Sequence, residues 1–241
     1  MFRPIYEPRT KAREYCDLAV NIYTGCNHGC TYCYAPRILH KKREDFDDLA
    51  PRKDLLESVV NQLKREKFID KKIMLCFTCD PYPAILETGI TRGVIRIIKN
   101  TGNHVQILTK GGARAVRDFD LLDENDSFGV TISCNNSEEV EPGAAPVAER
   151  IRTLQIAHSL GIKTWVSCEP VFEPKAVYRL ITNCNYIDLY RIGKLNYMKS
   201  EIDWALFGKT AERLCIQHGR NYYIKDDLRK IMDAAEKEGG A

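Results

Sequence analysis

The sequence predicts an α/β fold, a partial TIM-type barrel of six βα units around a parallel sheet. Apolar strand-like runs alternate with amphipathic helical runs, which is the pattern of βα repeats. A length of 241 residues suits one α/β barrel. No internal repeat or linker divides the chain, so we expect residues 1–241 to form a single domain.

Six segments are predicted as strands, at 18–24, 72–78, 104–109, 127–133, 163–169 and 186–193. Helical spacing lies between them, over 54–65, 91–100, 113–122, 148–160 and 174–182. Gly161 and Pro174 mark a helix end and a helix start, because glycine suits the left-handed residue after a helix and proline suits a first turn. After the sixth strand we expect a segment around 204–218, a short apolar run at 221–224 and a last helix from about Asp226.

Composition indicates a reducing, cytoplasmic environment. Ten cysteines would indicate disulfides in a small secreted protein, but the first eight residues lack the apolar stretch of a signal peptide. No apolar run approaches the roughly 18 residues that span a bilayer. We therefore expect no insertion into a membrane. We also expect a monomer. A net charge of +3 is only a weak indication of a polyanionic substrate.

Three cysteines, Cys26, Cys30 and Cys33, form a CxxxCxxC motif after the first predicted strand. A [4Fe–4S] cluster usually takes four cysteines, so three leave one iron open to another ligand. Zinc is an alternative, with His28 as a fourth ligand, but structural zinc sites usually join two separated pairs and no second pair follows. Packing as core thiols is the other alternative, although Gly29 and its polar neighbours do not form an apolar stripe. The motif therefore favours a cluster.

The cysteine spacing, with the aromatic Tyr32 just before the third cysteine, resembles the radical S-adenosylmethionine (SAM) superfamily. The resemblance implies a partial (β/α)6 barrel and a [4Fe–4S] cluster whose open iron binds the methionine end of SAM. It also implies reductive cleavage of SAM to a 5′-deoxyadenosyl radical, with an electron donor such as flavodoxin or ferredoxin.

SAM presents an ammonium, a carboxylate and two ribose hydroxyls, and functional residues of a parallel barrel lie at the carboxyl ends of its strands. Asp80 and Glu169 can bind the cation or the hydroxyls, Lys110 the carboxylate and Ser133 a hydroxyl. Each of these alone can also be an ordinary surface charge or turn residue. The expected SAM-binding residues are Tyr32, Asp80, Lys110, Ser133, Glu169 and Gly193.

Further motifs resemble the spore photoproduct lyase-related, DNA repair photolyase-like branch of the superfamily. They lie at 8–15, 21–26, 28–30, 32–36, 78–82, 91–92, 108–110, 117–118 and 141–143. The best-known member uses the SAM-derived radical to reverse a thymine dimer without light, and a cysteine after its second strand returns a hydrogen atom to the product. Cys79 or Cys76 falls in that region. We expect Cys79 at the strand end and Cys76 about 10 Å deeper, at ~3.3 Å per residue. The lyase is longer and carries a C-terminal hairpin that enters the DNA.

The expected function is therefore radical SAM chemistry for repair or modification of a nucleic acid. The alternatives are a radical SAM enzyme acting on a peptide or small molecule, and a non-catalytic iron–sulfur or zinc protein. Four cysteines at predicted strand ends, Cys76, Cys79, Cys134 and Cys168, can act as a hydrogen donor, a redox pair or ligands of a second cluster, or can pack as core thiols. The basic run at 37–43 can hold a phosphate backbone, although acidic residues follow it at once.

Overall fold

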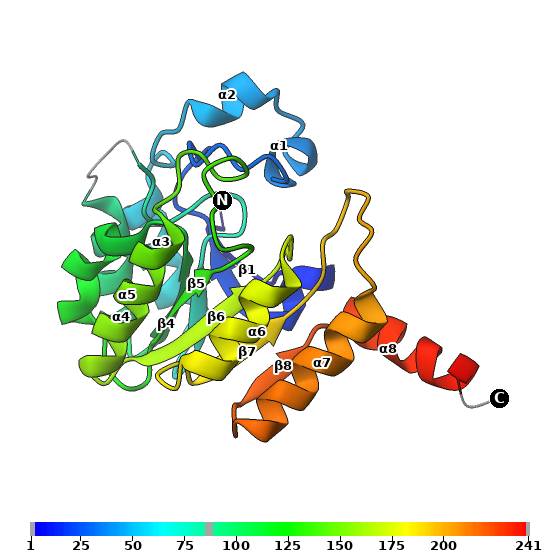
Figure 1. The fold of residues 1–241 in the computed structure, drawn as a ribbon. Helices are drawn as coiled ribbons and strands as arrows, with labels where there is room; N and C mark the ends of the chain where they lie inside the picture. Colours follow the sequence, from blue (N-terminus) through cyan, green and yellow to red (C-terminus); the bar gives the residue numbers. More distant parts are fainter. Residues whose placement is uncertain (1–2, 85–88, 240–241) are drawn as a thin grey trace.

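The computed structural model describes residues 3–84 and 89–239 of the chain. Its centre is one eight-stranded sheet whose spatial order is the order of the strands in the chain (Figure 1). The strands are β1 (Ile5–Tyr6), β2 (Leu18–Val20), β3 (Lys72–Leu75), β4 (His104–Thr109), β5 (Ser127–Thr131), β6 (Lys163–Cys168), β7 (Leu189–Ile192) and β8 (Tyr222–Ile224). Strand β1 pairs antiparallel with β2, and every other pairing is parallel.

Helices connect these strands in the expected alternation. They are α1 (Ala35–Ile38), α2 (Arg43–Asp47), α3 (Leu55–Glu66), α4 (Ile90–Asn100), α5 (Val147–Ser159), α6 (Pro174–Asn183), α7 (Trp204–Gln217) and α8 (Asp226–Gly239), with 3-10 helices η1 (Thr10–Glu14) and η2 (Gly112–Leu121). The predicted α/β partial barrel is confirmed. None of the helices in the described ranges is long and apolar enough to cross a bilayer.

The six predicted strands are present as β2 to β7, but the sequence reading missed the two edge strands. Residues 221–224, predicted only as an apolar run, form the parallel strand β8. The segment at 204–218 is the helix α7, and the helix predicted at 113–122 is the 3-10 helix η2. Several predicted strands were also too long. Strand β3 stops at Leu75 because Cys76 has φ 67°, a left-handed conformation that an extended strand cannot contain.

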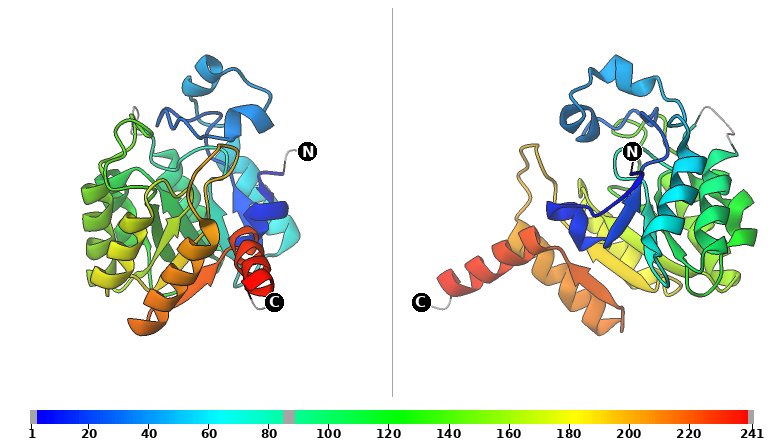
Figure 2. Two further views of the ribbon diagram at one scale, coloured as in Figure 1. Left: turned by 45° about the vertical axis from the view of Figure 1, so that its right-hand side comes forward. Right: turned by 180° about the vertical axis from the view of Figure 1, so that it is seen from behind.

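The sheet has a different core on each face. Helices such as α3 and α4 turn Val59, Leu63, Val94 and Ile98 toward one face, at the spacing of three to five residues that keeps side chains on one side of a helix. Segment η1 and the residues after it cover the opposite face (Figure 2). There Trp165 packs among Ala19 and Met74 in a smaller core. The cavity described below opens above this second core.

Candidate active site

The loop that carries the three cysteines is fixed at its base by Asn21. The Oδ1 atom of Asn21 accepts hydrogen bonds from two successive backbone N–H groups, those of Phe77 and Thr78, at 2.8 and 2.9 Å. Further along, the N–H of Cys26 donates to the Phe46 carbonyl at 3.0 Å. These bonds tie the loop to the chain after β3 and to α2.

Two glycines allow the close packing of the same loop. A Cβ on Gly25 would lie 2.0 Å from the Phe46 oxygen. On the other side, the N–H of Gly143 donates to the carbonyl of His28 at 2.8 Å, and a Cβ on Gly143 would lie 2.3 Å from the carbonyl oxygen of Asn27. The loop is thus held between α2 and the connection from β5 to α5.

His28 is engaged by protein groups at both ring nitrogens. Arg114 donates to Nε2 at 3.1 Å, and Nδ1 lies 3.4 Å from Asp80 Oδ2. Because a guanidinium can only donate, the ring proton is on Nδ1 and faces the carboxylate. Burial lowers the pKa of His28 to about 4, so the imidazole is neutral. His28 is therefore not free to act as the fourth ligand that a zinc site would need.

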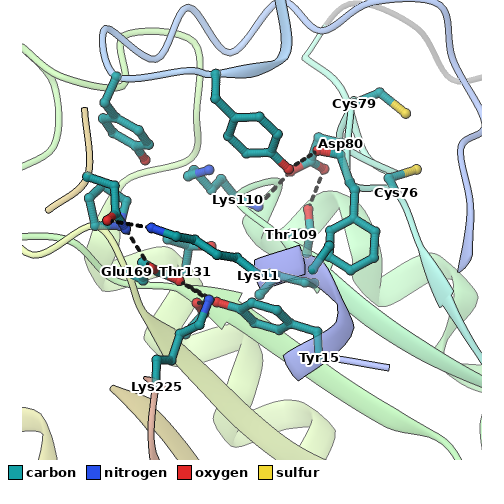
Figure 3. Close-up of a pocket in the computed structure, with 18 of the residues that line it drawn as sticks. Lys11, Tyr15, Cys76, Cys79, Asp80, Thr109, Lys110, Thr131, Glu169 and Lys225 are labelled. Atoms are coloured by element: carbon teal, nitrogen blue, oxygen red, sulfur yellow. Dashed lines mark hydrogen bonds and ion pairs between the residues drawn. The ribbon is translucent and has the colours of Figure 1, made fainter. Parts of the chain in front are cut away.

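A cavity of about 250 Å³ lies at the carboxyl ends of the strands (Figure 3). Most of the expected residues line it, namely Tyr32, Asp80, Lys110, Glu169, Cys76 and Cys79. Ser133 and Gly193 are not among its lining residues in the described ranges, and neither are the three motif cysteines Cys26, Cys30 and Cys33. The parallel-barrel rule therefore brings four of the six expected SAM-binding residues to one cavity.

Asp80 is a buried carboxylate that is already hydrogen-bonded by the protein. Its Oδ1 accepts from Thr109 Oγ1 at 2.5 Å and from the N–H of Tyr82 at 2.8 Å, and its Oδ2 accepts from the N–H of Lys110 at 2.8 Å. Burial alone would raise the pKa of Asp80, but His28 and these donors lower it. Asp80 therefore joins the ends of β3 and β4 as a charged group.

Glu169 faces the cavity from the end of β6 and has three partners. Lys225 Nζ lies 2.5 Å from Oε2, the Tyr15 hydroxyl donates to Oε2 at 3.0 Å, and Asn196 donates to Oε1 at 2.8 Å. Gly193 makes room for this carboxylate, since a Cβ there would lie 2.8 Å from Glu169 Cδ. Gly193 therefore does not line the cavity itself but leaves space for the Glu169 carboxylate that does.

Lys225 was missed by the sequence reading. Its side chain is only 3% exposed, and its ammonium lies 4.4 Å from the centre of the Tyr15 ring. It directly follows β8, so it lies at the same edge of the sheet as Glu169. Had the apolar run at 221–224 been predicted as a strand, Lys225 would have stood at its carboxyl end, where functional residues of a parallel barrel are expected.

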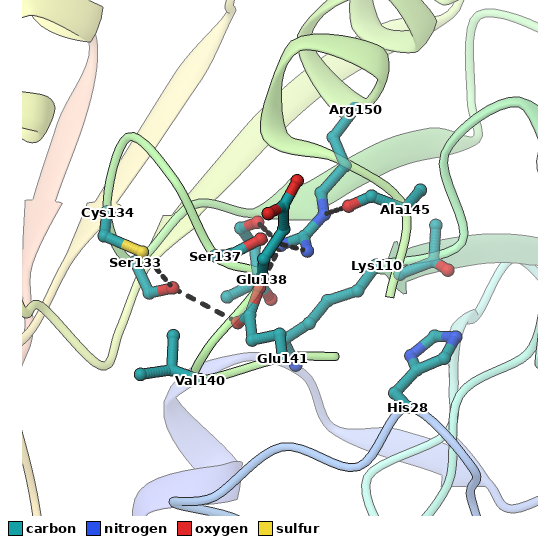
Figure 4. A network of polar contacts seen from close by, with 12 residues as sticks. His28, Lys110, Ser133, Cys134, Ser137, Glu138, Val140, Glu141, Ala145 and Arg150 are labelled. Atoms are coloured by element: carbon teal, nitrogen blue, oxygen red, sulfur yellow. Dashed lines mark hydrogen bonds and ion pairs between the residues drawn. The ribbon is translucent and has the colours of Figure 1, made fainter. Parts of the chain in front are cut away.

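A second buried network centres on Glu141 and Arg150 (Figure 4). Glu141 Oε1 accepts from the hydroxyls of Tyr32 and Ser133, and its Oε2 lies 2.6 Å from Arg150 Nη1 as an ion pair. Arg150 also donates to the carbonyl of Thr131 at 3.0 Å. Both charged side chains have 0% exposure. Ser133 therefore uses its hydroxyl within the protein, and the network positions the aromatic residue of the cysteine motif.

Comparison with known proteins decides the family. The sequence matches the radical SAM superfamily over residues 20–171. The chain belongs to this superfamily. It is a radical SAM enzyme, and its cofactors are a [4Fe–4S] cluster and SAM, as the cysteine motif indicated.

Two relatives show how far the likeness extends in sequence. The uncharacterized protein MJ0683 of Methanocaldococcus jannaschii is 27% identical over 175 residues, which are 70% of this chain and 64% of that protein. The uncharacterized protein ORF301 of Acidianus two-tailed virus is 28% identical over 179 residues, covering 66% of this chain and 57% of that protein. The chain thus spans less than two thirds of the length of both relatives.

Solved structures share the fold. A Cys-to-Ser variant of spore photoproduct lyase gives a TM-score of 0.71 at 15% identity, over 90% of this chain and 78% of that one. A lyase variant with bound AdoMet and dinucleoside spore photoproduct gives 0.68 at 14% identity, with the same coverage. Streptococcus suis SuiB bound to S-adenosylmethionine gives 0.60 at 13% identity, over 86% of this chain and 45% of that one. At these identities the likeness establishes the fold.

The three cysteines fit the radical SAM cluster better than a single metal ion. One zinc ion needs four ligand atoms close around it, whereas the thiolates of a cluster bind separate irons. In the described chain, the sulfurs of Cys26, Cys30 and Cys33 do not all lie within 4.8 Å of one another. Burial raises the pKa of Cys26 and Cys30, and binding to iron would hold these buried thiols as thiolates.

Lys110 brings a positive charge into the radical SAM pocket. Its ammonium lies 5.5 Å from the centre of the Tyr32 ring and has no hydrogen-bond or ion-pair partner among the described side chains. Burial alone would lower the pKa of Lys110, but Cys30, Glu141 and Asp80 raise it. The lysine is therefore charged and free to bind an anionic group such as the SAM carboxylate.

If Lys110 binds that carboxylate, Lys110→Ala should weaken SAM binding by about 1.5–3 kcal/mol, the usual value for a hydrogen bond to a charged group. This is roughly a 10- to 150-fold increase in Kd, which isothermal titration of the reconstituted protein would measure. Iron content should not change, and Lys209→Ala on the exposed side of α7 should bind SAM like the wild type. Unaltered affinity in Lys110→Ala would transfer the role to another residue of the pocket.

The structure corrects the expected depth of Cys76. Because the chain turns at Cys76 and does not continue as a strand, Cys76 and Cys79 both line the cavity. Of the other rim cysteines, Cys134 donates to the carbonyl of Asn136 at 3.0 Å, and Cys168 has 0% exposure. Neither is among the residues that line the cavity in the described ranges.

Proposed function

We propose that this radical SAM enzyme acts on a nucleic acid, in a repair or modification reaction. The observation that carries the proposal is a basic and aromatic rim at the mouth of the pocket. There Arg37 Cζ lies 4.5 Å and Lys11 Nζ 5.6 Å from the centre of the Tyr197 ring, and Lys11 also pairs with Asp227. Single-stranded nucleic acids are bound by this combination, because bases stack on aromatic rings while cations attract phosphates.

Tyr197 is an exposed residue of this rim. Its side chain is 65% exposed, and its φ of 66° is a strained conformation for an aromatic residue. Strain of this kind clusters at binding sites. Ile38 and Met198, 51% and 47% exposed, lie close to Arg37 and Tyr197 along the chain. The rim therefore offers an apolar platform beside positive charge.

Only part of the basic run at 37–43 supports this surface. Arg37 contacts Tyr197, but Lys41 donates to the carbonyl of Thr24 at 2.9 Å, and Arg43 pairs with Asp47 at 3.1 Å. Arg37 is therefore the residue of this run that we assign to the rim beside Tyr197. A solved spore photoproduct lyase contains dinucleoside spore photoproduct, and its fold likeness adds support for a nucleotide substrate.

When both cofactors are bound, reductive cleavage of SAM supplies a 5′-deoxyadenosyl radical in this pocket. In our proposal Cys26, Cys30 and Cys33 hold the cluster and Lys110 binds the SAM carboxylate. Glu169, held in place by Lys225, offers Oε1 and Oε2 to the ammonium or a ribose hydroxyl. The side chains of Tyr15, Phe77, Leu108 and Pro170 add apolar wall to the cavity and restrict water around the reacting atoms.

Cys79 is our proposed donor of the hydrogen atom that quenches the substrate radical, because it lines the pocket beside Asp80. Cys79→Ala should retain iron and SAM cleavage but divert the product toward adducts or abortive 5′-deoxyadenosine, which liquid chromatography with mass spectrometry would detect. Wild-type product from Cys79→Ala, with altered product from Cys76→Ala, would assign the donor role to Cys76. No effect of either variant would favour a peptide or small-molecule substrate.

The rim is tested by Tyr197→Ala. Loss of one stacked base should weaken binding of a fluorescent single-stranded oligonucleotide by about 1–3 kcal/mol, roughly 5- to 150-fold in Kd. Leu206→Ala removes a side chain of similar exposure, 62%, from α7 and should bind like the wild type. Equal affinity of Tyr197→Ala and wild type would contradict the proposed platform.

We also propose that residues 1–241 act as one domain and as a cytoplasmic monomer, and that flavodoxin or ferredoxin supplies the electron. Support for one domain comes from the single sheet in which all eight strands pair. Analytical ultracentrifugation and reduction of the cluster by each purified electron carrier would test the remaining parts.

A further inference from the structure

The connection from β7 to α7, residues 193–203, forms an arm that rises from the body of the molecule (Figure 1). Two of its residues, Asn196 and Tyr197, line the pocket. The arm contains no helix or strand, and in the described ranges none of the backbone N–H groups of residues 194–201 donates a hydrogen bond to the protein. Side chains therefore have to hold the arm against the pocket.

Asn196 makes the hydrogen bonds that fasten the arm. Its Oδ1 accepts from Lys11 Nζ at 2.9 Å, and its Nδ2 donates to Glu169 Oε1 at 2.8 Å. Lys11 is itself fixed by an ion pair with Asp227 at the start of α8. Tyr197 is the next residue along the chain, so the two bonds of Asn196 help to place the exposed aromatic ring of the rim.

The same asparagine holds the oxygen of Glu169 that has room for a ligand. A carboxylate has about four acceptor positions, two on each oxygen. Oε2 of Glu169 accepts from the Tyr15 hydroxyl and pairs with Lys225, whereas Asn196 is the one partner of Oε1 in the described ranges. The unused acceptor position is therefore on Oε1. A SAM ammonium or hydroxyl that binds there would share this oxygen with Asn196.

We propose that Asn196 is a positioning residue, which directs Oε1 of Glu169 toward SAM and links SAM binding to the position of arm 193–203. Asn196 acts through Glu169 and does not contact the reacting atoms. A SAM donor on Oε1 fixes the carboxylate, and the carboxylate fixes the amide of Asn196. The arm then stays closed against the pocket.

The consequence for turnover rests on the proposed function, in which Glu169 binds SAM and Tyr197 stacks on a base. A base stacked on Tyr197 holds the arm where Asn196 meets Glu169, so less order remains to be imposed when SAM binds. By linkage, SAM tightens nucleic-acid binding by the same factor by which the nucleic acid tightens SAM binding. The arm thus favours SAM binding when substrate is present.

The positioning role is tested on the reconstituted full chain without a reductant, so that SAM binds but is not cleaved. Saturating SAM should slow trypsin cleavage after the exposed Lys199 of the arm at least about threefold, because proteolysis needs a locally opened segment. In Asn196→Ala the Kd for SAM should rise about 3- to 10-fold, and saturating SAM should not slow this cleavage.

Ser200→Ala, at an exposed position of the same arm, is the control and should behave like the wild type. Iron content should not change in either variant. Two results would overturn the positioning role: no protection of Lys199 by SAM in the wild type, or equal protection in Asn196→Ala and the wild type.

The link to substrate is tested by titrating SAM with and without a saturating single-stranded oligonucleotide. We expect the oligonucleotide to lower the Kd for SAM about fivefold in the wild type and to leave it unchanged in Asn196→Ala. A bound oligonucleotide that does not alter the wild-type Kd for SAM would overturn the link. Absence of oligonucleotide binding would instead refute the nucleic-acid proposal, and protection of Lys199 by SAM would still decide the role of Asn196.

Discussion

Replacement of Cys30 with alanine is expected to abolish formation of 5′-deoxyadenosine. Two remaining thiolates are too few to hold the cluster, and SAM then lacks the open iron that binds its methionine end. The same result is expected for Cys26→Ala and Cys33→Ala. Iron analysis and chromatography of the products after anaerobic reconstitution would measure both losses.

Cys215→Ala is the control for this experiment. Cys215 is fully buried in α7 and is not among the residues that line the cavity in the described chain, so its loss should leave iron content and SAM cleavage unchanged. Full SAM cleavage by Cys30→Ala would refute the cluster assignment.

The largest effect on stability is expected from Arg150→Ala. This change leaves Glu141 as an unpaired charge in the protein interior, which costs about 3–5 kcal/mol. Urea unfolding followed by far-UV circular dichroism should show a much lower midpoint. Glu141 also accepts a hydrogen bond from Tyr32, which directly precedes Cys33 in the cysteine motif. Iron incorporation should therefore fall as well.

Two control variants distinguish the loss of the buried Glu141–Arg150 ion pair from the general effect of removing an arginine side chain. Arg3→Ala removes a surface ion pair in which Arg3 is 65% exposed, and should cost no more than about 1 kcal/mol. The double variant Glu141→Gln with Arg150→Met removes both charges and should recover part of the loss. A midpoint for Arg150→Ala equal to that of Arg3→Ala would contradict the role of the pair.

The sequence predicted those parts of the site that follow from a repeated pattern. Strand periodicity located β2 to β7, and the barrel rule then selected Asp80, Lys110 and Glu169 as residues at one edge of the sheet. The cysteine spacing alone indicated the cluster. These signals are local, since each depends on residues a few positions apart.

Features that depend on contacts between distant segments could not be predicted. Nothing near Glu141 in the sequence indicates that its partner is Arg150 or that it accepts from Tyr32, 109 residues away. The position of Cys76 depends on its left-handed φ, which cysteine rarely adopts and the apolar pattern does not reveal. The three-residue strand β8 was too short to show alternation, so Lys225 was missed.

Transfer of deuterium from a nucleic acid tests the central claim most directly. The reconstituted enzyme would be given SAM, a reductant and oligonucleotide pools made from perdeuterated nucleotides, including ultraviolet-irradiated pools. If the radical formed in this pocket abstracts hydrogen from a nucleic acid, mass spectrometry should find deuterium in 5′-deoxyadenosine or in recovered SAM. Unlabelled 5′-deoxyadenosine and SAM from every pool, at an unstimulated rate of SAM cleavage, would contradict the account.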